Sequence, residues 1–77
     1  MENRTRELLT FSVLVALGRC ESQVKGHIMT NLHVRNGRAR LTDVLTQLLP
    51  FIGYPRTLNA LRVIDEVVPQ RPAGTTA

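Results

Sequence analysis

The fold of this 77-residue chain is decided by residues 8–17, which read Leu8-Leu9-Thr10-Phe11-Ser12-Val13-Leu14-Val15-Ala16-Leu17. On a helix this stretch is apolar on almost every side, and such a helix has to be covered on all sides. Three further short helices of the same chain can hardly cover it alone. The stretch does not alternate between apolar and polar residues as a half-buried strand does. We therefore predict a central helix from about Arg4 to Leu17, ended by Gly18, a residue suited to a left-handed C-cap.

Three further helices follow from apolar spacing and from turn residues. The second is predicted from about Glu21 to Val34, with an apolar stripe from which Asn31 is displaced: Val24, Ile28, Met29 and Leu32. Gly26 lies within it and could let a neighbouring helix approach closely. Asn36-Gly37 is a turn signal that separates this helix from the next.

The third helix is predicted from about Arg38 to Phe51, because apolar residues recur there with helical spacing at Leu41, Val44, Leu45, Leu48 and Leu49. Pro50 lacks a backbone donor, so we expect it to kink or fray the end of this helix. Gly53-Tyr54-Pro55 marks the next break, and the fourth helix runs from Pro55 to Val68. The sequence thus predicts one all-α domain of about four helices over residues 1–68 and a flexible tail over residues 69–77.

So short a chain is expected to need additional stabilisation. A domain of this size buries only about 60% of the surface that its unfolded chain exposes. Cys20 is the only cysteine, and His27 and His33 are not spaced as a helical pair of metal ligands. Because small domains otherwise rely on disulfides, metals or partner subunits, we expect a homo-oligomer.

Composition excludes several other classes of protein. No apolar run reaches the roughly 18–20 residues of a membrane span, and the charged start is unlike a secretory signal. A single free cysteine without such a signal favours the reducing cytoplasm. The net charge is +4, and three arginines of one loop, residues 35–40, supply most of it. With only three aromatic residues, none interleaved with these arginines, nucleic acid is not an expected partner.

Several segments, in this order, resemble the carboxymuconolactone decarboxylases and their alkylhydroperoxidase D-like relatives. The similarity covers about residues 4–68 and is carried by Thr5-Arg6-Glu7-Leu8-Leu9-Thr10, Ala16-Leu17-Gly18-Arg19, His27-Ile28, Leu48-Leu49-Pro50-Phe51-Ile52-Gly53-Tyr54-Pro55 and Leu58-Asn59-Ala60-Leu61-Arg62-Val63. The resemblance implies an alkylhydroperoxidase D-like helical fold that assembles as trimers or hexamers. It also implies that members of the family carry further helices before the point where this sequence starts.

The resemblance implies one of two chemistries. Decarboxylase members remove carbon dioxide from a lactone of aromatic-compound degradation and shift its double bond. Peroxidase-like members use a Cys-x-x-Cys-x-x-x-His run, which here reads Cys20 to His27 with Gln23 at the second cysteine position. Because one of the two sulfurs is missing, thiol peroxidase-like activity is disfavoured, and Cys20 is better interpreted as a small buried apolar residue.

His27 is the first candidate catalytic residue, because an imidazole can give or take a proton near neutral pH. Glu7 is the second, as the carboxylate that would orient His27 or relay its proton. Arg6 is a candidate clamp for a substrate carboxylate, and Tyr54 a candidate substrate contact. Each also has a structural alternative: a hydrogen-bonded core histidine, a first-turn glutamate that favours the helix dipole, a solvated arginine, and a tyrosine that packs a turn.

Two functions remain open at this point. The first is a cofactor-free lyase that acts on a small anionic lactone or related acid. The second is a non-catalytic helical oligomerisation protein that keeps the packing residues of the family. A solvent-accessible site containing His27, Glu7 and an arginine would favour the enzyme.

Overall fold

The structure is a computed structural model that describes residues 1–69, which form four helices and no strand: α1 (Asn3–Leu17), α2 (Glu21–His33), α3 (Arg38–Ile52) and α4 (Tyr54–Val67). Each boundary lies within one residue of the predicted one, so the all-α prediction is confirmed. The predicted tail, apart from Pro69, lies outside the described residues. None of the four helices is both long and apolar enough to cross a lipid bilayer.

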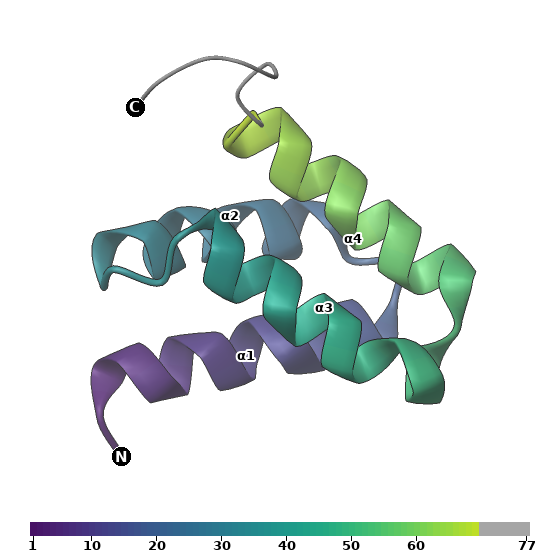
Figure 1. The fold of residues 1–77 in the computed structure, drawn as a ribbon. Helices are drawn as coiled ribbons and strands as arrows, with labels where there is room; N and C mark the ends of the chain where they lie inside the picture. The colour runs from purple at the N-terminus through teal and green to yellow at the C-terminus, as the bar shows by residue number, and fades with distance from the viewer. Residues whose placement is uncertain (70–77) are drawn as a thin grey trace.

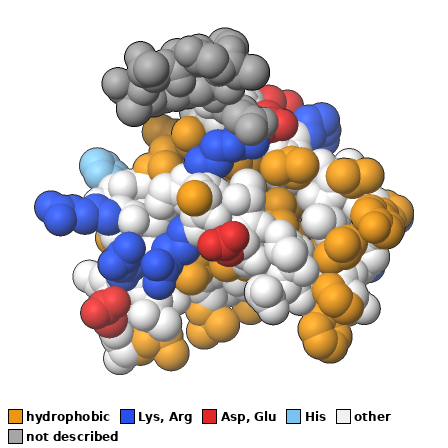
Figure 2. Space-filling model, viewed as in Figure 1, with side chains coloured by type: hydrophobic (Ala, Val, Ile, Leu, Met, Phe, Trp, Pro, Cys, Tyr) orange, Lys and Arg blue, Asp and Glu red, His pale blue; other side chains and the backbone are white. Residues whose placement is uncertain are grey.

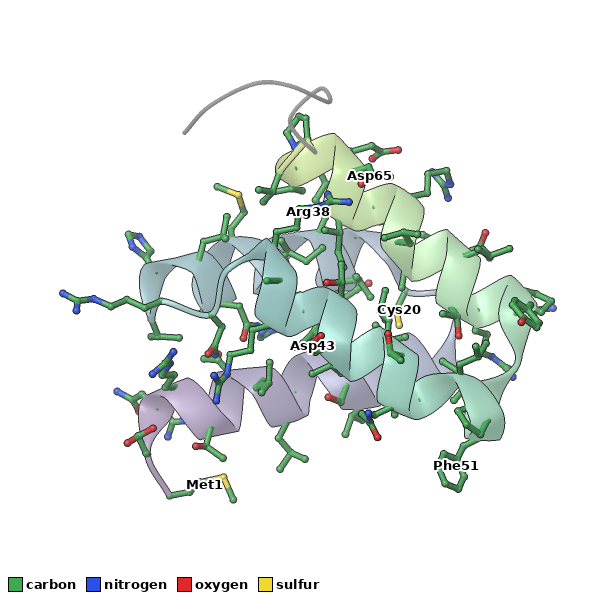
Figure 3. The ribbon with its side chains drawn as sticks, viewed as in Figure 1. Met1, Cys20, Arg38, Asp43, Phe51 and Asp65 are labelled. Atoms are coloured by element: carbon green, nitrogen blue, oxygen red, sulfur yellow. The ribbon has the colours of Figure 1, made fainter. Side chains whose placement is uncertain are left out.

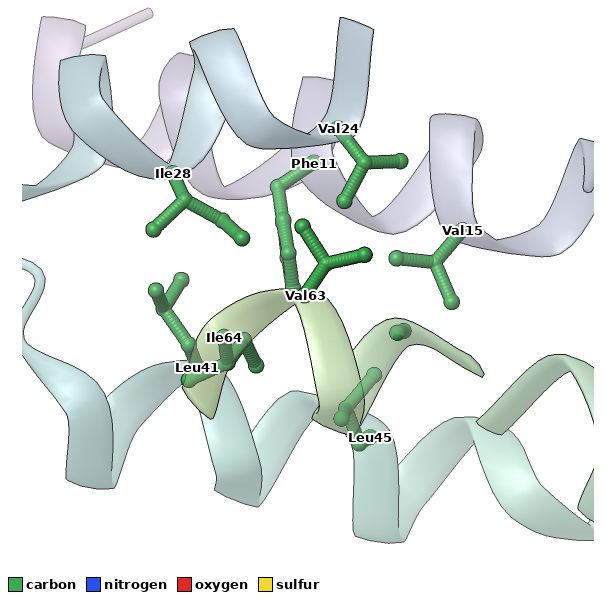
Figure 4. Close-up of a cluster of buried hydrophobic side chains, with 9 residues drawn as sticks. Phe11, Val15, Val24, Ile28, Leu41, Leu45, Val63 and Ile64 are labelled. Atoms are coloured by element: carbon green, nitrogen blue, oxygen red, sulfur yellow. The ribbon is translucent and has the colours of Figure 1, made fainter. Parts of the chain in front are cut away.

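The helices pack as two pairs around one core (Figure 1). α1 lies along α2, α3 lies against α4, and α2 also packs against α4. The side chains between them form a single buried cluster to which every helix contributes (Figure 4): Phe11, Val15, Val24, Ile28, Leu41, Leu45, Ala60, Val63 and Ile64. Phe11, the largest of these, is completely buried and belongs to α1.

Two glycines end α1 and α3 in the same way. Gly18 has φ 74° and ψ 169°, and Gly53 has φ 83° and ψ 169°. The backbone N–H of Gly18 donates to the carbonyl of Leu14, and that of Gly53 donates to the carbonyl of Leu49. The positive φ expected of Gly18 is confirmed, whereas its extended ψ differs from the left-handed helical value of a standard C-cap. Side chains are strained in this backbone region, which explains why both helices end at glycine.

Arg38 fastens the start of α3 to the end of α4. Its guanidinium donates to the carbonyl of Val68 at 2.7 Å and forms an ion pair with Asp65 (Figure 3). The basic loop is therefore partly structural, because one of its three arginines is taken up by contacts within the chain.

The rest of the chain covers α1 on one side only, in line with the expectation that three further short helices can hardly cover it alone. Only Phe11 and Val15 of this helix are buried, whereas Leu9, Val13 and Leu17 are 52%, 50% and 66% exposed. These three residues lie four apart and form one stripe, which we call the α1 stripe. The other helices pack on the opposite side of α1, so none of them covers it. A second exposed apolar group, formed by Phe51, Tyr54 and Leu58, lies at the corner between α3 and α4, where Phe51 projects outward (Figure 3). Figure 2 shows apolar side chains gathered at this end of the molecule.

Three smaller expectations are also corrected. Pro50 does not fray α3, which continues to Ile52, because one missing donor in the last turn of an exposed helix end costs only one backbone hydrogen bond. Gly26 is not a site of close helix approach, since no atom lies within 4 Å of the position that a Cβ would take. Asn31, displaced from the apolar stripe of its helix, is nonetheless fully buried.

Candidate functional site

His27 and Glu7 face each other across the contact between α1 and α2. The Nδ1 atom of His27 lies 3.9 Å from the Oε2 atom of Glu7. This separation exceeds that of a hydrogen bond, for which about 3.2 Å is the upper limit. The two groups form an ion pair only when the imidazole is protonated. The two residues, 20 positions apart in the sequence, are therefore brought together by the packing of the first two helices.

Neither of these two facing atoms has a hydrogen-bond partner among the described residues, although both are buried. Burying a polar atom without a partner is unfavourable, so native structures contain few such atoms, and those that occur call for an explanation. Here two of them face each other, which makes the pair chemically distinct from the rest of the interior.

Exposure differs between the two side chains. The side chain of His27 is 37% exposed, and that of Glu7 is 14% exposed. Because Nδ1 is buried, the exposure of His27 belongs to its other atoms, and Nε2 is the ring nitrogen on the edge away from Glu7. The geometry is that of an imidazole with one edge toward a carboxylate in the protein and the other available to a molecule from outside.

Asn31 holds the backbone of both residues. Its side-chain amide donates to the carbonyl of Glu7 at 3.0 Å and to the carbonyl of His27 at 2.7 Å. Its Oδ1 atom accepts a hydrogen bond from the amide of Asn36 at 2.9 Å. Asn31 and Asn36 are both completely buried, so this network is shielded from water and joins α1, α2 and the loop before α3.

Asn36 extends the network to the first turn of α1. Its amide also donates to the carbonyl of Arg4 at 2.8 Å, and its Oδ1 accepts from Nε of Arg4 at 3.1 Å. The sequence predicts Asn36 only as a turn residue and indicates no role for Asn31. Asn31 lies beside the apolar stripe of its helix, so the sequence carries only a weak signal of its burial without a second chain position to pair it with.

Comparison with known protein families assigns the chain as a whole. A family model described as "Carboxymuconolactone decarboxylase family" matches residues 1–66, which is most of the chain. The chain belongs to the carboxymuconolactone decarboxylase family. No curated protein and no solved structure matches it. The resemblance inferred from separate motifs is thereby confirmed at the level of the family.

In this carboxymuconolactone decarboxylase family member, the structure does not bring Arg6 and Tyr54 to the pair. The guanidinium of Arg6 is exposed and donates to Oδ1 of Asn3 at 2.6 Å, within the first turns of α1. Tyr54 starts α4 and is 67% exposed. α4 begins at the end of the molecule where α1 finishes, whereas Glu7 is in the first half of α1 (Figure 1).

Cys20 precedes α2 and is partly buried (Figure 3). Its sulfhydryl group donates to the carbonyl of Leu14 at 3.0 Å, which fits the interpretation of a small packing residue. Gln23, which replaces the second cysteine of the peroxidase-like run, is exposed. Residues 1–69 contain no group of three His, Cys, Asp or Glu side chains placed to hold a metal ion.

Proposed function

We propose that this protein is a cofactor-free lyase of the carboxymuconolactone decarboxylase type, which decarboxylates and isomerises a small anionic lactone or a related acid. The observation that carries the proposal is the facing pair of buried atoms, Nδ1 of His27 and Oε2 of Glu7, 3.9 Å apart. Membership of the family supports the reaction class.

In the proposed reaction, His27 supplies the proton that replaces carbon dioxide. The bond between the substrate carbon chain and its carboxylate breaks, and carbon dioxide leaves. The bonding electron pair moves into the conjugated system of the lactone, and the imidazolium of His27 delivers a proton to a carbon further along, which shifts the double bond. His27 then regains a proton from solvent.

Glu7 acts on His27 rather than on the substrate in this proposal. In this proposal the Glu7 carboxylate orients the ring through Nδ1, with a hydrogen bond that closes from 3.9 Å when the substrate binds, which leaves Nε2 as the atom that exchanges the proton. The smaller exposure of Glu7 suits this part, because a group behind the imidazole cannot reach a substrate easily. Arg6 is the proposed carboxylate clamp and would have to release Asn3 to reach a substrate. Tyr54 is assigned no contact with a substrate bound at this pair.

The proposal includes a homo-oligomer, a trimer or a hexamer, with the alkylhydroperoxidase D-like arrangement of helices over residues 1–68. The exposed α1 stripe supports it, since three half-exposed apolar side chains in a row are typical of a surface that a second subunit covers. We also place the protein in the cytoplasm, where its free Cys20 would stay reduced.

One experiment tests the reaction directly. The protein is incubated in D₂O with an unsaturated lactone that carries a carboxylate, and released carbon dioxide and the mass of the product are measured. We expect release above the uncatalysed rate and one deuterium at the carbon that receives the proton, on a single face. Release no faster than in buffer, across a panel of such lactones, would contradict the proposal and favour the non-catalytic alternative.

That alternative, a helical oligomerisation protein, has its own supporting observation. The second exposed apolar group, Phe51, Tyr54 and Leu58, lies apart from the His27 and Glu7 pair and adds to the surface available for assembly. A stable oligomer without turnover of any lactone is the result that this alternative predicts.

A further inference from the structure

A cavity of about 350 Å³ lies between the end of α1, the start of α2 and α4. Its volume is within the range of small-molecule sites, roughly 300–1,000 Å³. Neither His27 nor Glu7 lines it. The cavity is therefore separate from the pair described above, and its contents do not depend on the proposed reaction.

The inner wall of the cavity is apolar. Val15, Val24, Ala60 and Val63 line it, and all four belong to the buried core. Such a wall offers no hydrogen bond from its side chains, so it favours the hydrocarbon part of a ligand and excludes a strongly hydrated one.

Two arginines, Arg19 and Arg56, lie at the exposed rim of this cavity. Neither donates a side-chain hydrogen bond to any described residue or forms an ion pair within residues 1–69. Glu21 lines the same rim without pairing with them, so the rim carries a net charge of +1 from two cations and one anion.

Most of the other arginines within residues 1–69 are paired. Four of them, Arg4, Arg6, Arg38 and Arg62, donate to acceptors within the protein. Arg35 and Arg40 resemble the rim arginines in having no such acceptor among the described residues, but neither lines the cavity. The rim thus combines unpaired guanidinium groups with an apolar hollow beside them.

Arg56 is also held in place at the rim. A Cβ built on Gly18 would lie 2.8 Å from Nε of Arg56, so this guanidinium packs directly on the backbone where α1 ends. Because part of the side chain is already restricted, less conformational freedom is lost when it binds an anion.

We propose that this cavity binds a small carboxylic acid with an apolar body. The carboxylate lies at the rim between Arg56 and Arg19, whose planar guanidinium groups match the two oxygens of a carboxylate. The apolar body lies against Val15, Val24 and Val63.

Benzoate is a suitable probe, and its binding to the ¹⁵N-labelled full chain can be followed by NMR titration. We expect saturable shifts of the backbone amides of Val15, Val24 and Val63, with a Kd of about 1 mM or lower. Benzamide, which has the same shape without the charge, is expected to bind at least roughly tenfold more weakly. Acetate, which has the charge without the ring, is also expected to bind at least roughly tenfold more weakly than benzoate.

A pair of matched variants separates the rim from general charge effects. Arg56→Gln is expected to weaken benzoate binding at least roughly tenfold, whereas Arg40→Gln, an equal change of charge away from the cavity, leaves the Kd unchanged. Both positions are exposed, so both variants are expected to fold. His27→Asn is expected to bind benzoate as the wild type does, which keeps this result independent of the reaction.

Two results would overturn the proposal. One is the absence of saturable benzoate shifts at the cavity residues up to about 10 mM. The other is an equal Kd for benzoate in the wild type and in Arg56→Gln, which would show that the rim does not hold the carboxylate.

Discussion

Asn31 is bonded to Glu7 across the contact between the first two helices, its side-chain amide donating to the Glu7 carbonyl at 3.0 Å. The same nitrogen donates to the carbonyl of His27 at 2.7 Å. One buried amide therefore sets the distance between the two backbones that carry the proposed catalytic side chains. The pair is a product of tertiary packing, and its geometry depends on a residue that takes no part in proton transfer.

We predict that Asn31→Asp destabilises the fold strongly. The substitution keeps the shape but replaces a donor by a carboxylate that faces two carbonyl oxygens in a fully buried position. The expected loss is about 3 kcal/mol in the free energy of unfolding, measured by urea denaturation. Asn3→Asp, the same change at an exposed position that keeps its bond to Arg6, is expected to stay within about 0.5 kcal/mol of the wild type. Similar losses in the free energy of unfolding of both variants would show that the Asn31 network does not stabilise the fold specifically.

Two glycine substitutions are expected to act in opposite directions. Gly18→Ala places a side chain at φ 74° and 2.8 Å from Nε of Arg56, so it is expected to destabilise the protein by about 1–3 kcal/mol. Gly26→Ala fills open space in the middle of α2 and is expected to stabilise it by about 0.5–1 kcal/mol. Thermal unfolding of both variants checks the prediction. A stabilising Gly18→Ala would mean that α1 does not end as described.

The contacts of Arg38, which link α3 to α4, are expected to contribute measurably to the stability of the fold. Arg38→Met removes the hydrogen bond to the Val68 carbonyl and the ion pair with Asp65 while keeping most of the apolar stem. We expect a loss of about 1–2 kcal/mol in the free energy of unfolding. Arg40→Met, two residues further along the same helix and exposed, serves as the control and is expected to change little. Equal effects of the two variants would argue against a specific role of Arg38.

The sequence was sufficient to predict the helices because their ends carry strong local signals. Gly18 and Gly53 adopt positive φ, and Asn36 lies in the turn before α3, so these boundaries depend on residues next to them in the chain. The pairing of His27 with Glu7 was expected only through a family resemblance, because the distance between α1 and α2 is a tertiary property. Asn31 was missed for the same reason, as its partner Glu7 lies 24 residues earlier.

The exposure of α1 agrees with the expectation that a single copy of the chain cannot cover this helix. An apolar stretch indicates that a helix is to be covered but does not identify what covers it, and the rest of the chain packs on one side of α1 only. Leu9, Val13 and Leu17 consequently remain half-exposed or more, and covering them is left to other copies in our proposal.

We predict that a charge in the α1 stripe weakens self-association. Val13 is 50% exposed, so Val13→Glu is tolerated by the folded subunit but opposes burial against a second copy. Light scattering after size-exclusion chromatography is expected to show a multiple of 8.6 kDa for the wild type and a smaller mass for the variant. Gln47→Glu, which adds the same charge at an exposed site on α3, is expected to keep the wild-type mass. A monomeric wild type at micromolar concentration would contradict the proposed assembly.

The most direct test of the central claim compares the two histidines of the chain in the decarboxylation assay. His27→Asn removes the proposed proton donor, whereas His33→Asn changes an exposed histidine at the end of α2. We predict that kcat/KM falls by a factor of roughly 10²–10⁴ in the first variant and stays unchanged in the second. Equal kcat/KM for His27→Asn and the wild type would contradict the assignment of His27 as the residue that moves the proton.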